Sequence, residues 1–554
     1  MENWLFVCAI FLLRIGEFCD ASSRILMLAP VATSSHLTVF RTLGQGLAKR
    51  GHHVRILHTL ETTTLEQGLF GPGTGKTNTS SGQEWLSDSI NGTYVEISPS
   101  GIANLFGKYF DNPFQFQREA RNGKGTMRMK KMYGILRDSC ADVYGDPDFL
   151  DTVMRKKFDL VIVQGILNDC VLGAVDKMGV PFMYLSPGPL FPSVQWSLGT
   201  PWSVSSAPAP FVQGFGVPKT MLNRLRNLMA SAAETFMSNK LGAWATEPVV
   251  NSAFGDSARM FDLAAVKRNV SFVLVNQLAA FDYTRPQASN SALVGGMHCR
   301  PAGNIEEKEL LTFLDNAENG VAYFSLGSTA LSTDMPRELR QVFIKTFAKL
   351  QMKVVWKLET SRMTPEEIAT IPPNVFVSPW LPQQDLLGHK NVKVFLTHGG
   401  ILSVQEATYH GVPMIGIPIG SDQDMNLQRA TSDGRAIVLD FDTLTPKEII
   451  SAIRRVISEK SFRENAVAGL HLMRDQPIHP LNRAIFWTEY VIRHNGAKHL
   501  RNEGASLPWI PYLNLDLYAM MLIMILVISW CFSRVVRWGF KKLKVAMAPK
   551  HSIS

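Results

Sequence analysis

Residues 376–426 read FVSPWLPQQDLLGHKNVKVFLTHGGILSVQEATYHGVPMIGIPIGSDQDMN and decide the fold of the second half of the chain. The apolar runs VFVSPW, VKVFLTHGG and VPMIGIPIG each end in a turn or a helix start, as do VAYFSLGS and KVVWKL upstream. Short apolar runs that alternate with helical segments are typical of a parallel sheet covered by helices. The second half is therefore predicted to be a parallel α/β domain.

The first half shows the same alternation. RILMLAP at 24–30 predicts a strand, the segment 36–51 has leucine and phenylalanine at near-helical spacing before Gly51, and HVRILHTL predicts the next strand. FDLVIV and VPFMYLS add two later strands. This order predicts a doubly wound sheet, so the fold class is α/β with two Rossmann-like domains facing across a cleft.

The domain boundary is expected where glycine, proline and asparagine accumulate, around residues 285–306. We assign 22–290 to a first domain that binds an acceptor and 291–500 to a second domain that binds a nucleotide, with C-terminal helices that return. The segments 102–131 and 187–218 resemble insertions above the first sheet, where a variable ligand would be recognised.

Both ends of the chain suggest a membrane protein. LFVCAIFLL at 5–13, followed by small residues, predicts a signal peptide over 1–21. The apolar run before Phe532 predicts a transmembrane helix over 517–533, and the basic tail 534–554 is then cytosolic. This topology makes most of the chain lumenal, as the sequons at Asn78, Asn91 and Asn269 also favour.

The net charge of +9 argues less for a nucleic-acid partner than it first suggests. Six basic residues lie in the acid-free tail, and without them the charge falls to +3. A domain that binds nucleic acid carries its basic surface on the fold itself, so we expect no nucleic-acid partner.

Cysteine and histidine spacing indicates no metal cluster, so no metal and no other cofactor is expected. Cys140, Cys170 and Cys299 fall in the lumenal part, and three cysteines cannot all pair. GPGTGKT at 71–77 resembles a phosphate-binding loop, but its glycine spacing is short by one and no strand leads into it.

Polar and aromatic residues follow the predicted strands of the second domain. Trp380 closes one strand and can stack on a flat base, with Gln383 one helical turn further on. His398 and Gly400 lie where the next strand turns into a helix, whose free amides suit a diphosphate.

Further candidates lie on the same edge of that sheet. Ser403 adds a hydroxyl at the helix start, and Glu406, two turns along, could accept both hydroxyls of a ribose. Asp422 and Gln423 follow the next strand, where sugar hydroxyls would project, and the loop at Ser328 is a weaker candidate. Each of these residues taken singly is common on ordinary protein surfaces or in cores.

In the first domain, His36 lies where the first strand turns into the first helix. Ser34 or Ser35 is expected to cap that helix and to leave His36 in its first turn. The helix dipole disfavours the imidazolium, so a neutral imidazole suited to a general base is expected.

These motifs, with VGGMH, FSLGS and WTEYVIRHNGAKHLR, resemble the membrane-anchored animal UDP-glycosyltransferases of the UDP-glucuronosyltransferase family, with invertebrate members most similar in character. The resemblance covers nearly the whole chain. It implies a glycosyltransferase B fold, a UDP-sugar donor and a small lipophilic acceptor. It also implies transfer with inversion at an endoplasmic reticulum membrane, without a metal, and in a homo- or hetero-oligomer.

The resemblance also implies roles for the candidate residues. Trp380 would stack on uracil, while Gln383 and Glu406 would hold base or ribose. Ser328, His398 and Ser403 would face the diphosphate, and Asp422 and Gln423 the sugar. His36 would deprotonate the acceptor hydroxyl.

The chain departs from the family pattern at one position. Family members carry Asp or Glu in the loop after FDLVIV to orient the catalytic histidine, and here that position is Gln164. Asp169 is the only nearby carboxylate that could substitute.

Three functions remain open from the sequence. The first is hexosyl transfer, with glucose favoured and glucuronate the alternative donor sugar. The second is a donor-binding but weak or silent homologue that partners active relatives, which Gln164 supports. The third, a sugar-nucleotide epimerase, would have no use for an anchor.

Overall fold

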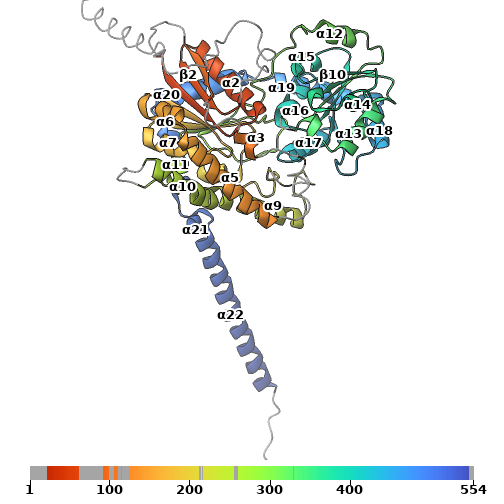
Figure 1. The fold of residues 1–554 in the computed structure, drawn as a ribbon. Helices are drawn as coiled ribbons and strands as arrows, with labels where there is room; N and C mark the ends of the chain where they lie inside the picture. The colour runs from red at the N-terminus through yellow and green to blue at the C-terminus, as the bar shows by residue number, and fades with distance from the viewer. Residues whose placement is uncertain are drawn as a thin grey trace, which may run out of the picture.

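The computed structural model describes residues 22–60, 92–98, 105–109, 114, 125–210, 212, 214, 216–254, 260–328 and 330–547. Figure 1 shows two α/β bodies side by side and one long helix, α22, that projects away from them. The predicted signal peptide, GPGTGKT and the sequons at Asn78 and Asn91 lie outside the described residues.

The first body is built on a seven-stranded parallel sheet in the order β3-β2-β1-β4-β5-β6-β7. Its central strands are almost wholly buried, as expected of strands covered on both faces. Its strands are β1 (Arg24–Ala29), β2 (His53–His58), β3 (Tyr94–Ile97), β4 (Leu160–Gln164), β5 (Phe182–Ser186), β6 (Phe272–Val275) and β7 (Ser291–Leu293). Its helices are α2 (Ser34–Lys49), α3 (Leu105–Tyr109), α5 (Gly125–Gly145), α6 (Pro147–Arg155), α7 (Leu172–Met178), α8 (Pro192–Ser197), α9 (Met221–Phe236), α10 (Gly242–Ala253) and α11 (Leu263–Arg268).

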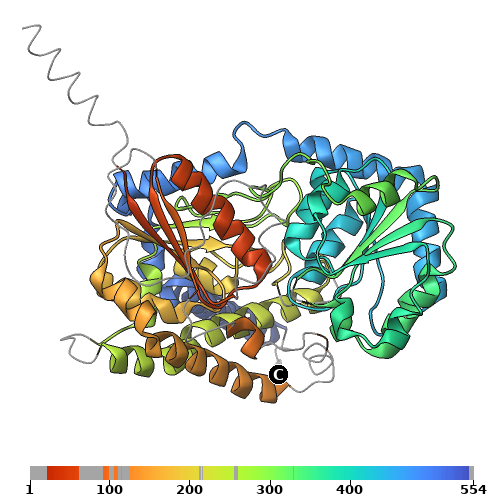
Figure 2. The same ribbon diagram turned by 45° about the horizontal axis from the view of Figure 1, so that its top comes forward.

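The second body holds a six-stranded parallel sheet in the order β10-β9-β8-β11-β12-β13 (Figure 2). Its strands are β8 (Val321–Ser325), β9 (Lys353–Lys357), β10 (Val375–Ser378), β11 (Val392–Thr397), β12 (Met414–Gly416) and β13 (Ala436–Val438). Its helices are α12 (Lys308–Asp315), α13 (Arg337–Phe347), α14 (Pro365–Ile368), α15 (Gln383–Leu387), α16 (Ile401–Tyr409), α17 (Gln423–Ser432), α18 (Pro446–Ser458) and α19 (Lys460–Arg474).

The C-terminal helix α20 (Pro480–Arg493) returns to the first body and packs on α2. The ring of Trp487 stacks on Phe272 of β6 with centroids 4.6 Å apart. Glu489 contacts Arg50 and His52 at the end of α2. Through these contacts α20, which follows the second body in the chain, packs on the first body. The predicted C-terminal helices were expected to return in this way.

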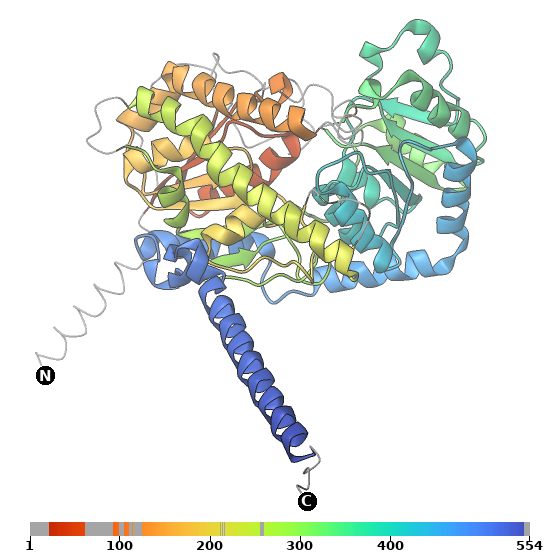
Figure 3. The same cartoon turned by 90° about the horizontal axis from the view of Figure 1, so that it is seen from below.

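The long helix α22 (Leu515–Ala546) follows the short α21 (Trp509–Tyr512). By length and composition, Leu515–Lys544 is the one helix among the described residues that could cross a membrane, and none of its most apolar part is buried. Figure 3, seen from below, shows it leaving from the side of the first body. The helix is longer than the predicted 517–533 because it continues into the basic tail.

Some sequence predictions need correction. The boundary at 290/291 would separate β7 from its sheet, because Val273, Leu274 and Val275 of β6 pair with residues 291–293. The first domain therefore extends beyond Leu293. The short strands β3, β6, β7 and β13 were not predicted, and the last residues of the segment 102–131 belong to the 21-residue helix α5.

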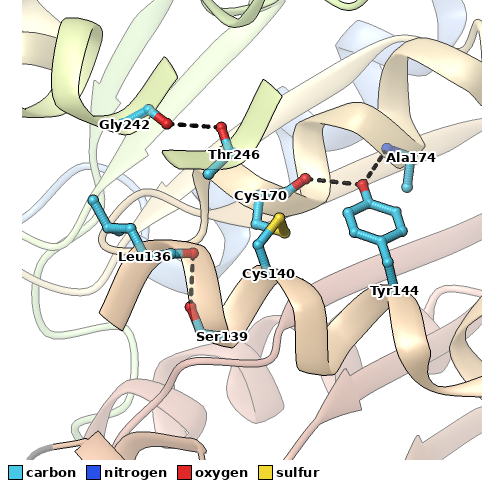
Figure 4. Close-up of a disulfide and its surroundings, with 8 residues drawn as sticks. All are labelled: Leu136, Ser139, Cys140, Tyr144, Cys170, Ala174, Gly242 and Thr246. Atoms are coloured by element: carbon cyan, nitrogen blue, oxygen red, sulfur yellow. Dashed lines mark hydrogen bonds between the residues drawn. A yellow bond between two sulfur atoms is a disulfide. The ribbon is translucent and has the colours of Figure 1, made fainter. Parts of the chain in front are cut away.

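The cysteine pairing is settled by the fold. Cys140 of α5 and Cys170 form a disulfide with Cα atoms 5.4 Å apart, and Cys299 is buried as a free thiol. Beside the disulfide, the hydroxyl of Tyr144 donates to Cys170 O and accepts from Ala174 N (Figure 4). The disulfide and Tyr144 together fasten α5 to the segment after β4.

Candidate active site

The carboxyl end of β1 places His36 in the first turn of α2. Thr33 is the N-cap, since its Oγ1 accepts a hydrogen bond from His36 N at 3.2 Å. The expected cap at Ser34 or Ser35 is wrong by one or two residues; Ser35 instead contacts the Thr33 hydroxyl. The helix start thereby holds the imidazole at the sheet edge where α/β proteins bind ligands.

Gln164 at the end of β4 contacts the His36 ring. Its Nε2 lies 3.0 Å from His36 Nδ1 and donates to Val31 O at 3.0 Å. Burial lowers the pKa of His36 to about 4, and no ionisable group offsets that effect. The imidazole is therefore neutral at physiological pH, as predicted, and its partner is an amide.

Asp169 is bound to other residues than His36. Its Oδ2 accepts from Lys267 Nζ at 2.6 Å and from the Ser238 hydroxyl at 3.4 Å. The Lys267 side chain is only 5% exposed, so Asp169 neutralises a buried cation. The structure brings Gln164, and not Asp169, against His36.

Replacing Asp169 with alanine is expected to cost stability rather than catalysis. The change leaves Lys267 buried without its counter-ion, which should lower the free energy of unfolding by about 3 kcal/mol, the lower end for a broken buried pair because the Asp169 side chain is 21% exposed. The double variant Asp169→Ala/Lys267→Met should recover much of that loss in thermal unfolding. A clear fall in kcat in a double variant whose melting temperature is close to that of the wild type would return Asp169 to the His36 site.

In the second domain, the ring of His398 lies between two glycines. A Cβ on Gly327 would meet His398 Cε1 at 2.6 Å, and one on Gly400 would meet Nε2 at 2.7 Å. Gly327 also has φ +81°, which favours glycine. Burial, with a smaller contribution from Lys357, lowers the pKa of His398 to about 4, and its Nδ1 is buried without a partner among the described residues.

Gln383, Ser403 and Glu406 form one hydrogen-bonded group. Gln383 Nε2 donates to Glu406 Oε2 at 2.6 Å and to the Ser403 hydroxyl at 3.1 Å. Its Oε1 accepts from the Tyr323 hydroxyl at 3.0 Å. The predicted Gln383 and Glu406 thus lie side by side, held by β8, α15 and α16.

His298 completes this group and was not predicted as a site residue. Its Nε2 lies 3.4 Å from Glu406 Oε1. Burial alone would lower the pKa of His298, but Cys299 and Glu406 outweigh that effect and raise it to about 10. The sequence signal was available in the VGGMH motif that ends at His298.

Trp380 and Lys357 lie at the edge of the same site. Lys357 Nζ is 5.5 Å from the centroid of the Trp380 ring and donates to Gly327 O at 2.8 Å. Burial lowers the pKa of Lys357. Lys357 was also missed, because a lysine closing the KVVWKL run carries no motif of its own. Ser328 lies beside Gly327 and is partly exposed.

Asp422 lies where the two domains approach each other. Its Oδ2 accepts from Asn426 Nδ2 at 2.8 Å and is 3.9 Å from where a Cβ on Gly188 would lie. Nearby, Gly214 N donates to Asp424 Oδ2 at 2.8 Å. The segment 187–218 of the first domain therefore borders the predicted sugar position.

The side-chain oxygen of Gln423 is hydrogen-bonded to the loop that precedes it. Its Oε1 accepts from Ile419 N at 2.7 Å and from Gly420 N at 2.9 Å. Its amide nitrogen has no hydrogen-bond partner within the described part of the chain and could donate to a ligand.

Two domains with this site between them match a known enzyme family. The model described as "UDP-glucoronosyl and UDP-glucosyl transferase" matches residues 25–549. The chain belongs to this family. The fold of this UDP-glycosyltransferase and its relationship to the animal enzymes are therefore confirmed.

Individual relatives cover this UDP-glycosyltransferase almost end to end. UDP-glucosyltransferase 2 of Dactylopius coccus is 30% identical over 524 residues, 94% of each chain. UDP-glucuronosyltransferase 2B7 of Homo sapiens is 29% identical over 538 residues, 95% of each chain.

Solved structures share the fold at lower identity. The glycotransferase of kitacinnamycin has a TM-score of 0.53 at 18% identity and covers 85% of this chain and 98% of its own. The calicheamicin glycosyltransferase CalG4 has a TM-score of 0.51 at 18% identity, with coverage of 86% and 99%. These likenesses bear on the glycosyltransferase B fold alone.

Proposed function

We propose that this UDP-glycosyltransferase transfers a hexose from a UDP-sugar to an oxygen of a small lipophilic acceptor with inversion. Glucose is the favoured sugar, and glucuronate is the alternative. The observation that carries the proposal is that His36 and the polar site of the second domain lie at the starts of α2 and α16, which share one hydrophobic core. Leu37, which follows His36, and Leu402 at the start of α16 belong to one hydrophobic cluster. The beginnings of α2 and α16 are thus fixed by one shared core.

Each part of the donor has a matching group. The Trp380 ring would stack on uracil, and the Gln383–Glu406 pair would hold base or ribose. His398, with Ser328, Ser403 and the free amides at the start of α16, would face the diphosphate. Asp422 and the free amide nitrogen of Gln423 would hold the sugar hydroxyls.

The leaving diphosphate would be stabilised by these neutral donors, so we propose no metal cofactor. For a neutral acceptor hydroxyl, His36 is the proposed general base: its nitrogen takes the proton while the acceptor oxygen attacks the anomeric carbon. The bond from that carbon to the diphosphate then breaks, and UDP leaves with the electron pair.

We also propose that the catalytic domains lie in the lumen of the endoplasmic reticulum, anchored by α22, with a short cytosolic tail. The buried Cys140–Cys170 disulfide supports an oxidising compartment. The apolar length and full exposure of α22 support an anchor.

The test uses membranes carrying the full chain, labelled UDP-glucose or UDP-glucuronate, and a panel of phenols and steroids. Transfer to an acceptor is expected, and His36→Ala should reduce transfer to neutral hydroxyl acceptors such as the steroids by about 100-fold or more with donor binding unchanged. His53→Ala, which changes a histidine at the opposite end of the sheet, is the matched control.

Donor binding without transfer to any acceptor would instead identify a silent homologue, and release of an isomerised donor an epimerase. Full transfer by His36→Ala with intact donor binding would remove His36 from the mechanism.

A further inference from the structure

The contacts of Gln164 favour one orientation of its amide. Three groups lie within hydrogen-bond distance of its Nε2: Val31 O at 3.0 Å, Ile166 O at 3.4 Å and His36 Nδ1 at 3.0 Å. Two of these are carbonyl oxygens, which cannot donate. Rotating the amide by half a turn would set Oε1 against both carbonyls and would move the NH2 group to the position where Oε1 now finds no partner.

This orientation determines which nitrogen of His36 carries the proton. An amide N–H donates to His36 Nδ1, so Nδ1 must offer its lone pair. A neutral imidazole then carries its proton on Nε2. A carboxylate at position 164 would do the reverse, since it accepts from Nδ1–H and leaves the lone pair on Nε2.

His36 Nε2 is the nitrogen left for the acceptor. Within the part of the chain the structure describes, it has no hydrogen-bond partner, and it is not among the buried unpaired atoms. In the tautomer set by Gln164, this nitrogen donates a hydrogen bond and cannot take a proton.

We infer that Gln164 is a positioning residue that makes His36 a hydrogen-bond donor, and that the acceptors preferred by this enzyme are ionised ones, such as acidic phenols or carboxylic acids. The inference rests on the proposed hexosyl transfer. It narrows the acceptor class, because a neutral alcohol is deprotonated only after the amide of Gln164 has rotated.

The reaction of an ionised acceptor is balanced without a base. The acceptor oxyanion, held by Nε2–H, forms the bond to the anomeric carbon with its own electron pair. The bond from that carbon to the diphosphate breaks, and UDP leaves with the electron pair of the broken bond. His36 keeps its proton throughout.

The surroundings of His36 do not compensate for the missing carboxylate. Among the described residues, the side-chain partners of His36 are the Thr33 hydroxyl, which accepts from its backbone N–H, and the Gln164 amide, which contacts its ring. Asp169, the carboxylate considered as a substitute from the sequence, is bound to Lys267. The lowered pKa of His36 agrees, because nothing there stabilises an imidazolium.

The first test measures kcat/KM of the full chain in detergent micelles from pH 5 to pH 9, with 4-nitrophenol, phenol and benzyl alcohol as acceptors of similar size. For 4-nitrophenol, kcat/KM should rise roughly tenfold per pH unit up to the pKa of that phenol and then level, whereas for the less acidic phenol it should rise over the whole range. Benzyl alcohol should be at least about 100-fold poorer than 4-nitrophenol at pH 8. One profile shared by all three acceptors would overturn the inference while leaving the transferase activity established.

The second test exchanges the amide for a carboxylate of the same shape. Gln164→Glu should raise transfer to benzyl alcohol by about tenfold or more, whereas Gln164→Ala, which removes the donor without supplying an acceptor, should not. A loss of benzyl alcohol transfer in a stably folded Gln164→Glu enzyme would count against the inference.

A spectroscopic measurement separates the inference from the proposed function. In full chain labelled with ¹⁵N-histidine, the His36 signals, assigned by their loss in His36→Ala, should show protonated Nε2 and unprotonated Nδ1 in the wild type. Protonated Nδ1 in the wild type would refute the inference whatever the activity. If no acceptor is used with either donor, the proposed function fails, and the tautomer alone then decides the role of Gln164.

Discussion

Replacing His398 with alanine should lower kcat for hexosyl transfer by about 10²–10³-fold, the loss seen when a single donor to developing negative charge is removed. The ring is held between Gly327 and Gly400, neither of which could carry a Cβ without a clash. Its buried Nδ1 has no partner among the described residues, so one ring nitrogen remains for a ligand. The pKa of about 4 keeps the ring neutral, and it would act as a fixed dipole rather than as a charge.

The measurement compares kcat, the affinity for UDP and the melting temperature. His410→Ala is the matched control, since His410 is also buried, has a pKa lowered to about 4, and lies at the other end of α16. We expect His398→Ala to reduce kcat and UDP affinity at a nearly unchanged melting temperature, and His410→Ala to leave kcat alone. Equal kcat values for the two variants would mean that His398 serves only packing.

The strand ends of the second domain were predictable because parallel strands place their carboxyl ends at one edge. Residues from VFVSPW, VKVFLTHGG and VPMIGIPIG therefore had to converge, and Gln383, Ser403 and Glu406 do lie in contact. Short strands such as β7 and β13 have only three residues each, too few for periodicity to distinguish them from loops.

The contacts that define the first-domain site were only partly predictable. The position of Gln164 after FDLVIV placed it near His36, 128 residues earlier in the chain, but sequence carries no information on amide orientation. From the sequence, Asp169 is an equally good candidate to contact His36. Its actual partner, Lys267, lies 98 residues further along the chain. Which carboxylate pairs with which cation is decided by packing between distant segments.

Eliminating the Cys140–Cys170 disulfide should give the largest loss of stability. The bridge closes a loop of about 30 residues, and the loop-closure entropy it removes from the unfolded chain corresponds to about 3–4 kcal/mol. For a domain of this size the melting temperature of the first domain should fall by about 10 °C. Since Tyr144 still joins α5 to Cys170 O and Ala174 N, the native arrangement should survive at low temperature with kcat within about threefold of the wild type.

The experiment follows thermal unfolding of wild type, Cys140→Ala/Cys170→Ala and Cys299→Ala, each with and without reductant. Reductant should lower the melting temperature of the wild type and of Cys299→Ala toward that of the double variant and should leave the double variant unchanged. Cys299 is a fair control because it is buried but unpaired. A double variant as stable as the wild type would show that the contacts of Tyr144, rather than the covalent bridge, hold α5 on the first domain.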